Sequence, residues 1–274
     1  MLRAISTHVF LRQRLHSGLL DSLAKGGAQG IEIFAARQHF DYTSRAHVKE
    51  IGDWFHSAPV APFSMHMPLF ADLEMGRGGS PSVNVVHPEK FRRIDAMDEI
   101  KRSLEAAEVI PLKFLILHLG EREDRWSPRT LEHALTAIEH LRAFARPLGL
   151  NLLLENISSE VTQPKNLLEI VNAGHFKDVG FCLDLGHAHF GEGAQAAIAE
   201  LKPMLRSAHI HDNHGGRDEH LWPGEGTIDW EGAMEELRTA PQLIAAVLEI
   251  ESQQGESTES ASARSAESFK MLGL

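Results

Sequence analysis

The 274-residue chain has one cysteine, one tyrosine and no long apolar run. With Cys182 as its only cysteine, the chain cannot form an internal disulfide, which is typical of proteins of the reducing cytoplasm. No apolar run approaches the roughly 20 residues that a membrane-spanning helix needs. Residues 1–18 also lack the apolar core of a secretory signal. The sequence therefore predicts a cytoplasmic protein with no membrane partner.

Positive charge is also scarce, with 27 lysines and arginines against 38 aspartates and glutamates, a net charge of −11. Proteins that bind nucleic acid usually neutralise its phosphates with basic side chains. The loops at 36–47 and 70–84 carry only three fixed positive charges, at Arg37, Arg45 and Arg77. The acidic balance and these loops argue against nucleic acid as a partner.

Histidine, by contrast, is abundant, with 17 residues in the chain. Four histidines and three aspartates fall between Ser207 and Trp230, a stretch too poor in apolar residues to build a long core strand. Histidine is the commonest metal ligand. A metal site and a solvated polar loop are both compatible with this density, so the positions of the histidines must decide.

Eight short apolar runs recur along the chain, separated by polar turns and helical patterns. They are 2–6, 30–35, 63–68, 113–120, 151–157, 179–187, 207–213 and 245–251. Runs of this length and composition suit buried parallel strands. Eight strand–helix repeats predict one (β/α)8 TIM barrel that forms a single α/β domain over residues 1–274. The alternative is an open doubly wound sheet, but no Gly-x-Gly-x-x-Gly follows the first run.

Helical periodicity links several of these runs. The predicted helices are 89–110, 127–149, 163–174, 229–241 and a last helix at 263–274, preceded by a polar loop at 251–262. Ser127 and Asp229 are residue types that favour the first position of a helix, and we expect both to cap helices.

Metal-ligating side chains fall near the ends of six consecutive runs, the third to the eighth. The set is His66, His118, Glu155, Asp184, His187, His209, Asp218, His220 and Glu249. The strand ends of a TIM barrel and the loops after them form its active site. A single strand-end histidine is often only a hydrogen-bond partner, but Glu155 follows three leucines, and burying an unpaired carboxylate is costly. Mixed carboxylate and imidazole ligands suit Zn²⁺, Mn²⁺, Co²⁺ or Fe²⁺ better than Ca²⁺.

At these residues the chain resembles the xylose-isomerase-like TIM-barrel superfamily, over nearly its whole length. That superfamily includes metal-dependent sugar isomerases and epimerases and the type IV apurinic endonucleases. In the epimerase branch one metal ion is held by four ligands, which match Glu155, Asp184, His209 and Glu249. In the endonuclease branch nine ligands hold three zinc ions, and all nine residues named above match them. The resemblance thus implies one to three divalent ions, Zn²⁺ or Mn²⁺, whereas His211 matches no ligand position in either branch.

Three functions follow as hypotheses. The first is a metal-dependent isomerase or epimerase of a small sugar or sugar-like polyol carbonyl compound, working through a metal-stabilised enediolate. Glu155 and Glu249 would then move the proton. Arg37 and Arg217 are candidates to bind a substrate phosphate or carboxylate, although both are equally compatible with solvated loop charges.

The second hypothesis is a multi-zinc phosphoesterase related to the type IV apurinic endonucleases, which the nine-residue match favours and the charge disfavours for a DNA substrate. The third is a catalytically silent barrel that only binds a sugar, but every expected ligand position is filled. The oligomeric state stays open, and a homo-oligomer is compatible with the sequence.

Overall fold

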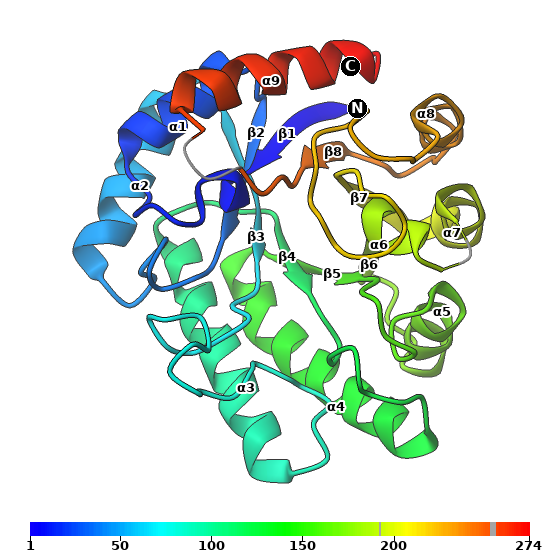
Figure 1. Cartoon of the computed structure of the whole chain (residues 1–274). Coiled ribbons are helices and arrows are strands. Elements are labelled where there is room, and N and C mark those ends of the chain that lie inside the picture. The colour runs from blue at the N-terminus through cyan, green and yellow to red at the C-terminus, as the bar shows by residue number, and fades with distance from the viewer. Residues whose placement is uncertain (192, 253–255) are drawn as a thin grey trace.

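The predicted apolar runs form eight parallel strands that close into a barrel, as the computed structural model shows (Figure 1). The model describes residues 1–191, 193–252 and 256–274. The strands are β1 (Leu2–Ser6), β2 (Gly30–Phe34), β3 (Ala61–His66), β4 (Phe114–Leu117), β5 (Asn151–Glu155), β6 (Gly180–Asp184), β7 (Leu205–Ile210) and β8 (Ala245–Leu248). Each strand pairs with the next in sequence, and β8 pairs with β1. This confirms the (β/α)8 barrel.

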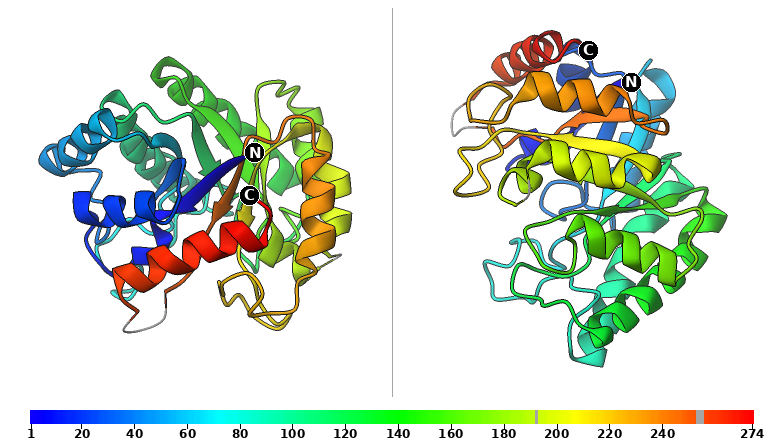
Figure 2. Two further views of the ribbon diagram at one scale, coloured as in Figure 1. Left: turned by 90° about the horizontal axis from the view of Figure 1, so that it is seen from above. Right: turned by 90° about the vertical axis from the view of Figure 1, so that its right-hand side faces the viewer.

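Helices surround the strands on the outside (Figure 2). They are α1 (Ser17–Lys25), α2 (Arg45–Ser57), α3 (Lys90–Leu104), α4 (Pro128–Ala145), α5 (Pro164–Ala173), α6 (Leu185–His189), α7 (Ala194–Leu201), α8 (Trp230–Arg238) and α9 (Thr258–Met271). The side chains of Ser127 and Asp229 accept hydrogen bonds from the first turns of α4 and α8, which confirms both predicted caps. No helix among the described residues is long and apolar enough to cross a membrane.

The boundaries of several elements differ from the prediction. The helix expected at 89–110 divides into α3 and the 3₁₀ helix η2 (Glu105–Glu108). Part of the loop expected at 251–262 lies outside the described residues, and α9 begins within it at Thr258 because Ser257 caps the helix there. The short helix α6 was not predicted, since its five residues follow β6 without a break in the sequence pattern.

Four strands share an inward pattern, in which an apolar side chain is followed two residues later by a metal-ligating one. Residues two apart on a strand point to the same face. The apolar cluster inside the barrel contains the first members, Ile116, Leu153, Cys182 and Val247. The second members are His118, Glu155, Asp184 and Glu249. The apolar cluster therefore forms a floor beneath a polar layer at the carboxyl ends of the strands.

The loop between β7 and α8 is organised around the buried carboxylate of Asp212. This carboxylate accepts hydrogen bonds from the indole of Trp230 at 2.8 Å and from the backbone nitrogens of Gly224 and Ile228 at 2.9 and 3.2 Å. The backbones of Asp212 and Leu221 also exchange two hydrogen bonds. These contacts fold the loop back over the barrel and return its middle part to the strand ends.

We predict that Asp212→Asn lowers the free energy of unfolding by about 1–3 kcal/mol, because an amide cannot accept all these hydrogen bonds and leaves buried donors unpaired. Trp230→Phe removes only one donor and is the milder control. Urea denaturation of the three proteins measures the difference. Equal stabilities of Asp212→Asn and the parent protein would contradict this role of Asp212.

Candidate metal centre

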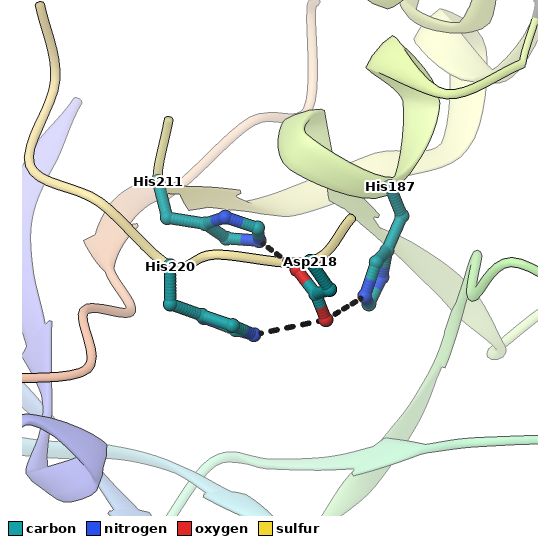
Figure 3. Close-up of side chains that lie close together, drawn as sticks. All are labelled: His187, His211, Asp218 and His220. Atoms are coloured by element: carbon teal, nitrogen blue, oxygen red, sulfur yellow. Dashed lines mark hydrogen bonds and ion pairs between the residues drawn. The ribbon is translucent and has the colours of Figure 1, made fainter. Parts of the chain in front are cut away.

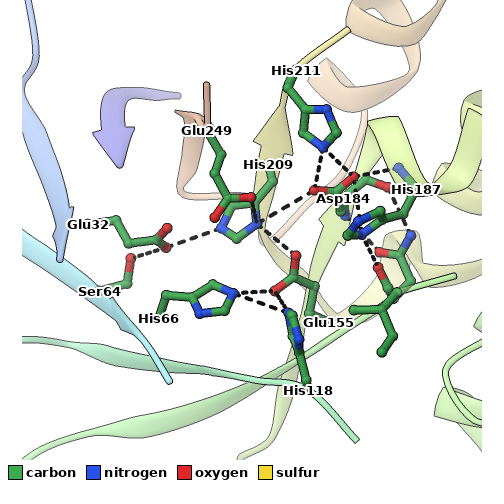
Figure 4. Close-up of polar contacts among 12 residues, drawn as sticks. Glu32, Ser64, His66, His118, Glu155, Asp184, His187, His209, His211 and Glu249 are labelled. Carbon is green, nitrogen blue, oxygen red and sulfur yellow. Dashed lines mark hydrogen bonds and ion pairs between the residues drawn. The ribbon is translucent and has the colours of Figure 1, made fainter. Parts of the chain in front are cut away.

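Three groups of metal-ligating atoms lie at the carboxyl ends of the strands, and within each group the atoms are no more than 4.8 Å apart. We call them the inner, middle and outer groups (Figures 3 and 4). The inner group is Glu155, Asp184, His209 and Glu249. The middle group is His66, His118 and Glu155, and the outer group is His187, His211, Asp218 and His220. The structure thus brings together all nine predicted ligand residues and adds His211.

In the inner group, three carboxylates surround one imidazole nitrogen. His209 Nδ1 lies 2.9 Å from Glu155 Oε1, 3.3 Å from Glu249 Oε2 and 3.9 Å from Asp184 Oδ2. Strand register places Asp184 directly beside His209. All four side chains are buried, so water cannot screen the repulsion between the carboxylates. A cation among them would offset that repulsion.

The pKa values of two carboxylates in the inner group are shifted in opposite directions. Burial, with the nearby charge of Glu155, raises the pKa of Glu249 to about 7, although His209 opposes the rise. Burial also acts to raise the pKa of Asp184, but His187 and His211 outweigh it and lower this pKa to about 2. In the metal-free barrel Asp184 is therefore charged at neutral pH, whereas Glu249 is only partly charged.

The middle group holds two imidazole nitrogens 3.1 Å apart, His66 Nε2 and His118 Nε2. Nδ1 of His66 lies 2.9 Å from the carbonyl oxygen of Met67. A carbonyl only accepts, so this Nδ1 carries a proton, and in the neutral ring Nε2 of His66 presents a lone pair. Glu155 Oε2 lies 3.0 Å from His118 Nε2 and 3.5 Å from His66 Nε2. Two imidazoles and a carboxylate that converge in this way are a ligand set for a divalent metal ion.

The outer group repeats this arrangement. Nδ1 of His187 donates to the carbonyl of Asn156 at 3.0 Å, and Nδ1 of His220 donates to the carbonyl of Glu249 at 2.7 Å. The Nε2 atoms of both rings face Asp218 Oδ2 at 3.0 and 3.2 Å (Figure 3). In their neutral forms these rings would aim lone pairs at a carboxylate, so a proton or a metal ion must lie between them. The backbone carbonyls orient the rings as expected for metal ligands.

Sequence reasoning missed Glu32 and undervalued His211. Glu32 is fully buried in β2, where its Oε2 lies 3.2 Å from His209 Nε2 and accepts a hydrogen bond from Ser64 at 2.8 Å (Figure 4). A carboxylate on the second nitrogen of a ligand histidine fixes its tautomer and raises its basicity. The available signal was a glutamate inside the apolar run GIEIF. His211, also fully buried, lies 2.9 Å from Asp184 Oδ2.

The two predicted substrate-binding arginines lie in different places. Arg37 forms an ion pair of 2.6 Å with the buried Glu99 and lies over the ring of Tyr42. Arg37 is not among the described residues that line the cavity above the three groups. Arg217 does line its mouth, where its side chain is 83% exposed and lies 3.2 Å from Glu219. Only Arg217 is placed to meet a ligand.

One cavity of about 1080 Å³ opens above the three groups. His8, Phe34 and members of all three groups form part of its wall. The loops after β4 and β5 and the start of α5 add Arg122, Arg125 and Lys165. The candidate metal ligands therefore lie at the bottom of a pocket large enough for a small polar molecule.

Comparison with known proteins shows the family and the fold of the chain. Residues 20–272 match the family described as xylose isomerase-like TIM barrel. The chain belongs to the xylose isomerase-like TIM barrel family. An uncharacterised protein of Methanocaldococcus jannaschii is 27% identical to it over 248 residues, 85% of this chain and 78% of the relative. A probable endonuclease 4 of Haloarcula marismortui is 24% identical over 60% of this chain and 67% of that protein.

Solved structures of the same fold cover almost the whole of this xylose isomerase-like barrel. A D-tagatose 3-epimerase-like protein superposes with a TM-score of 0.80 at 22% identity, covering 100% of this chain and 96% of its own. The IolI protein with a bound zinc atom superposes with a TM-score of 0.82 at 16% identity, covering 99% and 98%. At these identities the likeness establishes the fold.

The outer group predicts a pH dependence of stability in the metal-free barrel. Burial alone would lower the pKa of His187 and His220, but the Asp184 and Asp218 carboxylates raise them to about 10 and about 9. Both pKa values lie above the ordinary 6.5, so the protons stabilise the folded state fully below pH 6.5. This stabilisation is lost as pH rises through about 9 and 10.

Urea unfolding in the presence of a chelator, from pH 6 to pH 10, measures this loss. We expect a smaller decline when saturating Zn²⁺ replaces the chelator. In the presence of the chelator, we expect a smaller decline in the double variant His187→Gln and His220→Gln. The substitution His214→Gln, in the same loop but 58% exposed, is the control and should keep the decline. An identical slope in the double variant and the parent protein would contradict the assignment.

Glu32→Gln should weaken the tightest binding of Zn²⁺ by about 10–100-fold, because His209 loses the carboxylate that raises its basicity. Competition with a chromophoric chelator measures the affinity. Glu99→Gln removes an equally buried carboxylate outside the three groups and should leave the affinity unchanged. Unchanged affinity in Glu32→Gln would show that Glu32 has no role in metal binding.

Proposed function

We propose that the chain is a metal-dependent isomerase or epimerase of a small sugar or sugar-like carbonyl compound. The observation that carries the proposal is the unpaired oxygen of Glu249, a residue that lines the pocket. Oε1 of Glu249 is buried and has no hydrogen-bond partner among the described residues. Oε1 and Oε2 of Glu155, by contrast, contact His209 and His118. Glu249 is thus the carboxylate of the inner group best able to take up a proton.

Separate residues would carry out the steps of a proton transfer next to a carbonyl. A divalent ion bound by the inner group would act as a Lewis acid toward the carbonyl oxygen of the substrate. Glu249 Oε1, which has no hydrogen-bond partner among the described residues, takes the proton from the adjacent carbon. Glu155, which also contacts His209 Nδ1, would take up a proton from solvent once one of its oxygens is released and deliver it to the same carbon. The proton held by Glu249 would then pass to solvent.

The pocket and the family support a sugar-like substrate. A cavity of about 1080 Å³ accommodates a monosaccharide or a somewhat larger derivative. Ser158 and Ser159 line it and can offer hydrogen bonds to hydroxyl groups. The family description and the likeness to a D-tagatose 3-epimerase-like protein point to the same class. Zn²⁺ or Mn²⁺ suits this mixture of imidazole and carboxylate ligands, with one to three ions.

A multi-zinc phosphoesterase is the second candidate, favoured by one observation. The middle and outer groups are complete beside the inner group, and a metal cluster of this kind can activate water and stabilise a leaving oxygen. The relative from Haloarcula marismortui is described as a probable endonuclease 4, and an endonuclease is a phosphoesterase.

Hydrogen exchange distinguishes the two candidates. Purified protein saturated with Zn²⁺ or Mn²⁺ is incubated in deuterated water with ketoses, aldoses and their phosphates, and with a DNA duplex that contains an abasic site. The proposal expects deuterium at the carbon next to the carbonyl of at least one sugar, and intact DNA. Incision of the duplex without exchange in any sugar would replace the proposal with the phosphoesterase.

Glu249→Gln should lower turnover of the sugar identified in this way by about 10²–10⁴-fold, because an amide cannot accept the proton. Glu160→Gln changes a carboxylate of the same pocket that pairs with Arg125 at its rim, and should keep the parent rate. Metal content is measured in both variants, so that loss of metal is recognised. Full turnover by Glu249→Gln with its metal retained would rule out the assigned role.

A further inference from the structure

His211 belongs to the outer group by position but differs from the other members in its contacts. Its Nε2 lies 3.0 Å from Asp184 Oδ1 and 2.9 Å from Asp184 Oδ2, much closer than the 3.9 Å to Asp218 Oδ1. Its ring stacks on that of His220, with centroids 3.9 Å apart (Figure 3). His211 therefore links the outer group, to which it belongs by position, to the carboxylate of Asp184 in the inner group (Figure 4).

The second ring nitrogen of His211 identifies the tautomer. Nδ1 is buried and has no hydrogen-bond partner among the described residues. A buried N–H without a partner is rarer and more costly than a buried acceptor without one. The proton therefore belongs on Nε2, where Asp184 accepts it. His187 and His220 hold the opposite tautomer, with Nδ1–H donated to a carbonyl and Nε2 free to bind a metal ion.

Asp184 is held on several sides. Its Oδ1 accepts a hydrogen bond of 2.6 Å from the backbone nitrogen of His187, besides the contact with His211. The side chain of Asn156 bonds both the backbone nitrogen and the carbonyl of Asp184, at 2.7 and 2.9 Å. The N–H of His211 completes this frame and fixes the plane of the carboxylate, whose Oδ2 faces His209.

Gly186 makes room for the ring of His211. A Cβ atom at residue 186 would lie 1.9 Å from Cε1 and 2.4 Å from Nδ1 of His211. Any other residue would thus displace the ring, and with it the donor to Asp184. Two residues far apart in sequence, one on α6 and one after β7, are required for the same contact.

We propose that His211 is a positioning residue that donates a hydrogen bond to Asp184 and thereby sets the affinity of the inner group for its metal ion, with Gly186 as the residue that admits its ring. His211 acts through Asp184 and binds no metal itself. The inference rests on the cation binding that the proposed function requires, and not on the identity of the reaction.

The test compares the substitutions His211→Leu, His211→Gln and Gly186→Ala, with His214→Gln as the control. His214 lies in the same loop but is 58% exposed and pairs with Glu219. Zn²⁺ alone is the probe. Competition with a chromophoric chelator gives the affinity of the tightest site, and elemental analysis gives the number of ions bound at saturation.

We expect His211→Leu and Gly186→Ala to weaken the tightest site by about 10–100-fold with the number of ions unchanged. His211→Gln should stay within about fivefold of the parent protein, because the amide N–H of glutamine replaces the imidazole N–H. The control should match the parent. A purely structural role would not be rescued by glutamine.

Three outcomes would overturn the proposal. Loss of one bound ion in both His211→Leu and His211→Gln would show that His211 is a ligand. Parent affinity in His211→Leu, or failure of glutamine to restore it, would show that the hydrogen bond does not matter. If His211→Leu does not fold, as judged by circular dichroism, the affinities of Gly186→Ala and His211→Gln are compared instead. Parent affinity in Gly186→Ala, or weakened affinity in His211→Gln, would then overturn the proposal. Failure of the proposed function would appear differently, as absent turnover with these affinities as expected.

Discussion

Repulsion between buried carboxylates at one end of the barrel is the constraint on which the rest of the structure depends. Glu155, Asp184 and Glu249 converge on a single nitrogen of His209 above an apolar floor. Buried charges are tolerated only when they are paired and hydrogen-bonded. In the middle and outer groups, imidazole nitrogens also face carboxylates, which is unfavourable unless a proton or a metal ion lies between them. A divalent metal ion in each group would offset these unfavourable contacts.

The surrounding chain keeps these side chains in place. Strand alternation brings the ligands to one layer, and Asp212 folds the loop after β7 so that Asp218 and His220 reach the outer group. Glu32 and His211 each contact a residue of the inner group from the side away from its centre. The backbone of Glu249 is held as well, because its nitrogen donates to Ile210 and its carbonyl accepts from His220. A site for binding metal and a site for moving a proton can then share the same carboxylates.

Much of this could be predicted from the sequence, since eight apolar runs and strand-end ligands are local patterns. Seven of the nine candidate ligand residues lie within an apolar run, and Asp218 and His220 lie in the loop that follows the seventh run. Glu32 was missed because it lies in the middle of β2, whereas candidate ligands were sought near the ends of the predicted strands. The role of His211 depends on the space left by Gly186, which no periodicity reveals. Arg37 was assigned to substrate because loop charges cannot be placed without the fold, and its partner Glu99 lies on α3.

Anomalous X-ray scattering from a crystal of the zinc-saturated protein would locate the bound ions. We expect a zinc peak at about 2.0–2.2 Å from side-chain atoms of Glu155, Asp184, His209 and Glu249. Zinc peaks confined to the protein surface, with the inner group free of metal at saturating Zn²⁺, would contradict it.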